Sequence, residues 1–384
     1  MRRILTLALA NSAGGLHYFI LAYITSSYLG QFLPDAQIGL VYGVSAALML
    51  IGFAAAPAVL KRFSARESAL ALAALDLFTL LALSANPPAA LAVALVALQG
   101  MLAPLVSYTL DLFLEKATRD EGQTGHMRGM FLTSGNVALV ASPLLIGLIL
   151  GESSDYRRIF LTAAAAIFVF ILLIAFRKKN IEDVQLEHSV SLWETFVCLV
   201  RNGETRSVLI ANTILQCFFL WAPVYIPLYL HVSLGFSWSV IGPIFALMLL
   251  PFLLIELPMG YLEDSFRGAR FVMAAGFLIS GVSFAAVALI TASTSIVTVA
   301  VILILTRVGA ALIEVTSETS FFRGVSATDA NSVSFFRMTR PLGMLIGPLI
   351  ASAILFGISL DLLFVPLGAL TLLGIPFAFG IKDD

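Results

Sequence analysis

Twelve long apolar runs, separated by short polar segments, constrain this chain more than any other feature of its sequence. A helix needs about 20 apolar residues to cross the ~30 Å hydrocarbon core of a bilayer, and its backbone groups must be bonded within the segment. We therefore expect an all-α integral membrane protein with twelve transmembrane helices. The runs cover, approximately, residues 5–29, 37–60, 67–86, 89–113, 128–150, 158–176, 208–230, 238–261, 270–291, 295–318, 332–356 and 360–380.

The composition agrees with a membrane protein. Of the 384 residues, 60% are hydrophobic and only 12% are charged, about half the charged fraction of soluble domains. The net charge of −1 gives no basis for binding nucleic acid. The partner that the composition predicts is the lipid bilayer, and because no feature demands association with a second copy, we expect a functional monomer.

The basic residues predict the orientation of the chain. Arg157 and Arg158 are the only lysines or arginines in one set of alternate loops, and Arg307 lies inside an apolar run. All the others fall in the opposite loops or at the two ends. Under the positive-inside rule this bias places both termini in the cytoplasm, in a multi-pass protein of the cytoplasmic (inner or plasma) membrane.

The second half of the sequence repeats the first at a nearly constant offset. Such parallel repeats of six spans are typical of transporters. They predict two six-helix bundles, residues 1–176 and 208–384, joined by a cytoplasmic linker at 177–207 that carries an amphipathic helix. The matched pairs are Asn11-Ser12 with Asn212-Thr213, Pro57 with Pro258, Ser107 with Glu314, Asp111 with Glu318, and Ser142-Pro143 with Gly347-Pro348.

Six plus six spans, a basic central loop and cytoplasmic termini resemble the major facilitator superfamily along the whole chain. The loop from Gly260 to Arg270, with Asp264 in its middle, is similar to the cytoplasmic gating motif of that family. The equivalent first-half stretch, 57–66, lacks the aspartate, and no subgroup of the family can be assigned.

The resemblance implies a secondary transporter that works by alternating access. In this family the first, fourth, seventh and tenth spans surround a central site. Gly260, Asp264 and the acids Asp111 and Glu318 would then belong to the gate, where the two acids would pair with basic residues such as Arg66 and Arg270.

Three charged residues share one face of the tenth run. Arg307, Glu314 and Glu318 are spaced by seven and four, and Arg307 lies about 10 Å along the axis from Glu314. This face should line an aqueous cavity or pair with another helix. The repeat places Ser107 opposite Glu314, so the repeat does not require an acid there. Glu314 can bind solute or protons, or form an internal salt bridge with Arg307.

The first and seventh runs hold the other candidate binding residues, which are Asn11, His17, Asn212, Gln216 and Tyr225. A wet central site accounts for these polar groups, but hydrogen bonds between helices account for Asn11 and Asn212 equally well. His17 either titrates or is a hydrogen-bonded structural histidine.

Two acids in the apolar runs remain unexplained by the sequence. Asp76 lies in the third run and Glu256 in the eighth, and the sequence indicates no partner for either.

The sequence favours a secondary active transporter of a small-molecule solute, with protons as the coupling ion. No phosphate-binding Gly-x-x-x-x-Gly-Lys motif is present, and the scattered histidines and cysteines have no metal spacing, so we expect no metal, no cofactor and no enzymatic activity. The alternatives are an uncoupled facilitator or an ion-coupled exporter of amphiphilic, drug-like compounds. A membrane-embedded receptor or lipid-modifying enzyme is the alternative of another class.

Overall fold

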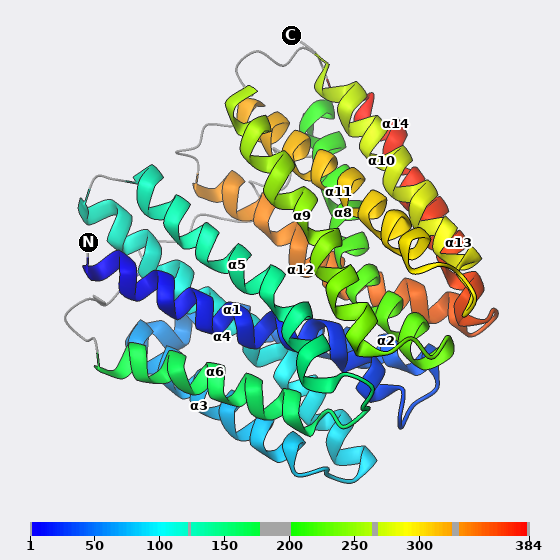
Figure 1. Cartoon of the computed structure of the whole chain (residues 1–384). Coiled ribbons are helices and arrows are strands. Elements are labelled where there is room, and N and C mark those ends of the chain that lie inside the picture. Colours follow the sequence, from blue (N-terminus) through cyan, green and yellow to red (C-terminus); the bar gives the residue numbers. More distant parts are fainter. Residues whose placement is uncertain (1, 122–123, 177–200, 263–267, 325–329, 382–384) are drawn as a thin grey trace. The chain divides into compact units, whose positions relative to one another are not determined.

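The computed structural model describes residues 2–121, 124–176, 201–262, 268–324 and 330–381 (Figure 1). Within these ranges every regular element is a helix, as the apolar runs predict. The amphipathic helix predicted in the linker and Asp264 of the gating motif lie outside the described residues.

The first half of the chain contains six helices, each of which coincides with one predicted run. They are α1 (Arg2–Leu29), α2 (Asp35–Arg62), α3 (Ala65–Ser84), α4 (Ala89–Glu121), α5 (Thr124–Leu150) and α6 (Arg157–Phe176).

In the second half, several runs are completed by a short helical extension. The elements are α8 (Gly203–Pro227) with the π-helix η2 (Leu228–Ser233), α9 (Trp238–Leu262), α10 (Ala269–Ala286) with the 3-10 turn η4 (Val287–Leu289), α11 (Ile296–Gly324), α12 (Ala330–Leu355), α13 (Leu360–Leu372) and α14 (Gly374–Ala378). Among the described residues, 11 helical segments are long and apolar enough to cross a membrane, and α9 adds the apolar stretch Trp238–Phe252.

Local chemistry sets several helix boundaries. Ser64 and Glu67 form a capping box at the start of α3: the Ser64 hydroxyl accepts from the Glu67 N–H at 3.1 Å, and the Glu67 carboxylate accepts from the Ser64 N–H at 3.0 Å. The side chain of Asn202 caps α8 in a similar way. These caps satisfy N–H groups that the first helical turn leaves without a partner.

The two prolines inside α8 do not break the helix. The α-helix continues through Pro223 and ends at Pro227, where the chain widens into the π-helix η2 instead of unwinding. A proline lacks an N–H and disturbs the preceding helical bonds, and the π-turn absorbs that disturbance. The hydroxyl of Tyr229 in η2 donates to the Ile290 carbonyl at 2.7 Å, which anchors the widened segment.

The helices fall into two compact units, and each is described separately. Unit 1 contains Met1–Leu33, Val41–Glu187 and Ser237–Pro243, and unit 2 contains Pro34–Leu40, His188–Phe236 and Ile244–Asp384. The first turns of α2 and α9 thus belong to the unit that does not hold the rest of the helix.

Close packing explains the placement of these two first turns. A Cβ added to Gly39 of α2 would lie 2.6 Å from the Pro348 carbonyl oxygen within unit 2. A Cβ added to Gly242 of α9 would lie 2.5 Å from the Pro143 carbonyl oxygen within unit 1. Only glycine allows the backbones to approach so closely at these two points.

Within unit 1, α1 packs against α4, α5 and α6, and α3 packs against α4 and α6 (Figure 1). Within unit 2, α8 packs against α11 and α12, and α10 packs against α11 and α13. Leucine, valine and phenylalanine side chains also remain exposed on the helices, for example Leu148 and Phe176. This all-round apolar character is what helices in lipid require.

Candidate functional site

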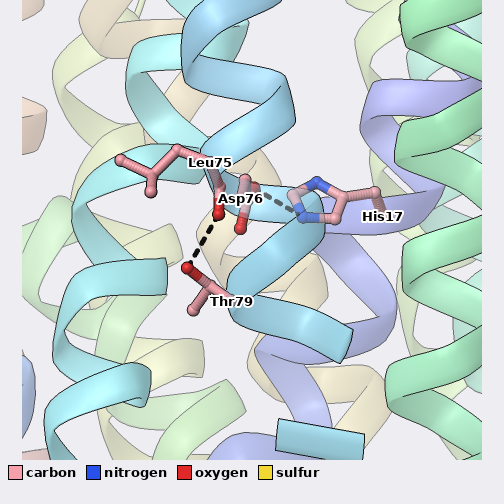
Figure 2. A network of polar contacts seen from close by, with 4 residues as sticks. All are labelled: His17, Leu75, Asp76 and Thr79. Carbon is pink, nitrogen blue, oxygen red and sulfur yellow. Dashed lines mark hydrogen bonds and ion pairs between the residues drawn. The ribbon is translucent and has the colours of Figure 1, made fainter. Parts of the chain in front are cut away.

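A buried histidine–aspartate pair joins α1 to α3 in unit 1. Nε2 of His17 lies 2.9 Å from Oδ2 of Asp76, and the two side chains are 1% and 0% exposed (Figure 2). Asp76 is the acid for which the sequence indicates no partner, and His17 is a predicted binding residue. The structure therefore supplies the partner of Asp76, which is His17 on α1, far from α3 in the sequence.

The surroundings of this pair are apolar. On α3, Ala73 and Leu80 lie one turn to either side of Asp76 and are fully buried. On α1, a Cβ added to Gly14 would contact Leu110 of α4 at 3.6 Å and Phe170 of α6 at 3.7 Å. A single charge at such depth costs about 2.5–3.5 kcal/mol on insertion scales, so the pairing of opposite charges or the sharing of a proton is needed here.

The contact with His17 is short, but it does not have the geometry of a hydrogen bond. Both carboxyl oxygens of Asp76 and Nε2 of His17 are buried, and none of the three has a hydrogen-bond partner among the described residues. The nearby hydroxyl of Thr79 donates to the Leu75 carbonyl at 2.9 Å, within its own helix, and so leaves the carboxyl group alone (Figure 2). A buried acceptor without a donor is costly, and the cost is greater when the carboxyl group is ionised.

In unit 2, Arg307 of α11 is buried while the acids on the same helix face are not. Arg307 is 3% exposed and its guanidinium lies 5.6 Å from the centroid of the Phe218 ring of α8, a cation–π distance. Glu314 and Glu318 are half-buried. The sequence allowed this face either to line an aqueous cavity or to pair with another helix, and Arg307 contacts another helix, α8. The salt bridge between Arg307 and Glu314 stays a prediction.

Asn11 and Asn212 form the same contact in the two units. In unit 1, the Asn11 amide of α1 donates to the Phe131 carbonyl at 2.8 Å and to the Ser134 hydroxyl at 3.2 Å, both in α5. In unit 2, the Asn212 amide of α8 donates to the Thr339 hydroxyl of α12 at 2.8 Å. We call these contacts the asparagine clasps.

The partners of the clasps repeat as well. Ser134 donates to the carbonyl of Phe131 at 2.6 Å, and Thr339 donates to the carbonyl of Phe336 at 2.6 Å. The offset between these partners is the 205 residues seen between Pro143 and Pro348. The sequence therefore held a signal for the clasps, because extending the repeat by nine residues finds both partners. Both asparagines thus form hydrogen bonds between helices, and a role of either one in solute binding stays a prediction.

Gln216 and Tyr225 of α8 also lie at close helix contacts. The Gln216 amide donates weakly to the Asn212 side chain at 3.5 Å. A Cβ added to Gly343 of α12 would lie 2.6 Å from the Cβ of Gln216. Tyr225 is fully buried, and its hydroxyl, like that of Ser352, lies against Gly39. Roles of these two residues in solute binding stay predictions.

The predicted gating residues that the structure describes belong to α3, α4, α9, α10 and α11. Arg66 of α3 donates to the Ile174 carbonyl at 3.1 Å and the Ala175 carbonyl at 2.6 Å, so it caps the C-terminus of α6, a role that the sequence did not indicate. Arg270 opens α10 and stacks over Phe271, 4.8 Å from the ring centroid. Asp111 is exposed on α4, and Gly260 belongs to α9.

Comparisons with known proteins agree with this architecture. A family profile described as the Major Facilitator Superfamily matches residues 4–255. The crystal structure of the nucleoside transporter NupG superposes with a TM-score of 0.78 at 14% identity, covering 100% of both chains. The POT family transporter PepTSo gives 0.75 at 14% identity, covering 99% of this chain and 97% of that one.

A second POT family transporter, in complex with a thioalcohol conjugated peptide, gives a TM-score of 0.76 at 11% identity and covers 98% of this chain and 95% of its own. At such identities the structural likeness shows the fold alone. A search of the curated proteins finds no significant match. The family match covers well over half of the residues and agrees with the duplicated bundles: the chain belongs to the Major Facilitator Superfamily.

Proposed function

We propose that this protein is a secondary active transporter that moves a small solute by alternating access and is driven by protons. Membership of the family supports transport as such. The observation that carries the coupling is the charged face of α11, where the half-buried Glu314 follows the buried Arg307 by two turns. An acid inside an apolar span whose side chain stays partly exposed is a candidate for a proton or solute site.

The two charged residues of this face suit different tasks. Arg307 is packed over Phe218 and is held in place by that contact. The side chain of Glu314 is partly exposed. Protonation of Glu314 removes a negative charge two turns from a fixed positive one, so the two protonation states favour different conformations of α11 by their differential interaction with the rest of the protein.

The gating and topology proposals follow from the family resemblance and the charge bias. Both termini would lie in the cytoplasm, in the cytoplasmic (inner or plasma) membrane. The cytoplasmic gate would comprise Asp111 and Glu318 at the ends of their spans, with Arg270 and the motif that includes Gly260 and Asp264. Arg66 would support the gate by holding α3 against the end of α6, where its two hydrogen bonds lie.

The first solutes to test follow from the structural neighbours. NupG is a nucleoside transporter and one POT structure holds a peptide conjugate. We propose nucleosides and short peptides as the first probes, screened by thermal shift on the purified protein before flux is measured. A probe that stabilises the fold would then be radiolabelled.

The coupling is tested by Glu314→Gln in proteoliposomes. With an imposed pH gradient, wild-type protein should accumulate the labelled probe, and Glu314→Gln should lose this accumulation by tenfold or more. Exchange of the probe across the membrane without a gradient should persist, because the amide keeps the shape of the side chain. Asp361→Asn, at the exposed start of α13, is the matched control and should behave as wild type. Undiminished gradient-driven accumulation in Glu314→Gln would remove the coupling role.

A further inference from the structure

We propose that His17 and Asp76 form a second proton-binding site, inside unit 1 and separate from Glu314. Every other acid of the spans whose side-chain exposure the structure describes keeps some exposed surface, whereas this carboxyl group is completely buried at mid-helix. The inference rests on the proposed function only for the use made of the proton. The binding of the proton itself is a separate and separately testable property.

The geometry allows one proton to be shared. Nε2 of His17 and Oδ2 of Asp76 are 2.9 Å apart, within the distance range of a hydrogen bond between a nitrogen and an oxygen. The two groups are not aligned as a hydrogen bond in this structure, so sharing the proton requires a rotation of the imidazole ring or of the carboxyl group. With one proton between them, the pair is either imidazolium and carboxylate or neutral imidazole and carboxylic acid. Both forms carry no net charge, and the proton moves between the two atoms without any other group taking part.

Any other number of protons gives the buried pair a net charge. Removing the proton leaves a net negative charge among apolar residues, and adding a second proton leaves a net positive one; either change is opposed by burial. The unpartnered Oδ1 of Asp76 adds to the cost of a full negative charge.

Other charged residues of the helices in unit 1 lie toward the ends of their apolar spans. On α3 they are Arg66 and Glu67 at its start, about 13–15 Å along the axis from Asp76. On α4 they begin at Asp111, in the last turn of its apolar span, and continue to the helix end. On α5 and α6 the titratable residues are confined to the first two turns, up to Arg128 and Arg158. Tyrosines apart, α1 adds only Arg2 and Arg3 at its start.

A structural ion pair is the competing interpretation, and energetics argues against it. Replacing a buried ion pair by apolar side chains of similar size is commonly neutral or stabilising. Holding α1 to α3 therefore needs no titratable groups, and unit 1 already joins α1 to α5 by the Asn11 clasp. Ionisable residues within a span mark proton pathways more often than simple packing.

The proton is measured directly, without any solute. Infrared difference spectra of the full-length protein in nanodiscs are recorded as the pH is changed, in light and heavy water. The bands of a protonated carboxyl group and of an imidazolium ring are both followed, because the proton can reside on either residue. We expect one of these bands to shift in heavy water, to be lost or altered in Asp76→Asn, and to be lost or altered in His17→Gln. Thr79→Val removes a buried hydroxyl one turn away that binds only its own helix, and this control should leave the bands unchanged.

The double variant His17→Leu/Asp76→Leu keeps the test independent of folding. It should unfold at or above the wild-type temperature, yet lack the bands assigned to the pair and lose pH-gradient-driven accumulation of the probe while retaining exchange. A double variant that folds and still accumulates the probe as wild type does would overturn the use of this proton in transport. The proton site itself would be overturned if Asp76→Asn neither removed nor altered a band that responds to pH or heavy water. If Glu314→Gln left coupling unchanged, only the proposed role of Glu314 would be contradicted. The proposal for His17 and Asp76 would stand, because the spectra measure proton binding without any transport.

Discussion

At the scale of the residue, the pairing of His17 with Asp76 shows what a single sequence leaves out. Both residues are visible in the sequence as unusual polar groups within apolar runs, and one of them had no identifiable partner. Their contact depends on how α1 and α3 are rotated about their axes. Because these helices are apolar on almost every side, no polar stripe reveals that rotation, so the sequence identifies the two residues but cannot identify the pair.

The pair also makes a prediction about stability. Asp76→Leu alone removes one member of a buried pair and should lower the free energy of unfolding by about 3 kcal/mol. The double leucine variant should be neutral or more stable by roughly 1 kcal/mol or more, since no polar group is then left buried. Thermal and denaturant unfolding in detergent measures both. Equal stability of the single variant and wild type would mean that the two side chains interact only weakly.

At the scale of the element, the asparagine clasps show that a repeat in sequence is also a repeat in hydrogen bonding. In each unit an asparagine of the first helix donates to a hydroxyl on the fifth, and that hydroxyl donates to a carbonyl three residues earlier. The helix limits followed from apolar length and caps, whereas η2 did not. A proline marks a disturbed helix but does not determine whether the chain unwinds, kinks or widens.

The clasps predict matched effects in the two halves. Asn11→Leu and Asn212→Leu should each lower the free energy of unfolding by about 1 kcal/mol, in line with hydrogen bonds between helices in membranes. Thr213→Val is the control, because its hydroxyl donates to the Leu209 carbonyl of its own helix at 2.8 Å, and its loss should cost less. A large loss for one asparagine and none for the other would contradict the equivalence of the clasps.

At the scale of the whole molecule, the number of spans and the family were accessible from the sequence, because a lipid environment requires long apolar helices and leaves few alternatives. The sides of the membrane were inferred from charge alone. Arg157 and Arg158 stand in the only predicted external loop with basic residues, and this loop is short, so the inference rests on the strong bias of all the other loops.

Labelling of single cysteines tests this orientation. In a background with Cys198 and Cys217 replaced by serine, Ser153→Cys in the exposed loop before α6 should react with an impermeant reagent added to intact cells. Arg201→Cys, exposed before α8, should react only after the cells are opened. The opposite pattern would mean that the orientation is the reverse of the predicted one. Labelling of both cysteines from the same side would contradict the single span, α6, between them.

The first turns of α2 and α9 each belong to a different unit from the rest of their helix. Leu40 and Val41 are neighbours in α2, and Pro243 and Ile244 are neighbours in α9, but each junction divides one unit from the other. Independent movement of the units would thus strain both helices. Either α2 bends beside Gly39 and Gly43, or its first turn separates from Pro348, against which Gly39 packs. Likewise, either α9 bends beside Gly242 and Pro243, or its first turn separates from Pro143, against which Gly242 packs. Bulky replacements at Gly39 and Gly242 would then act on the timing of the transport cycle as well as on the fit of the helices.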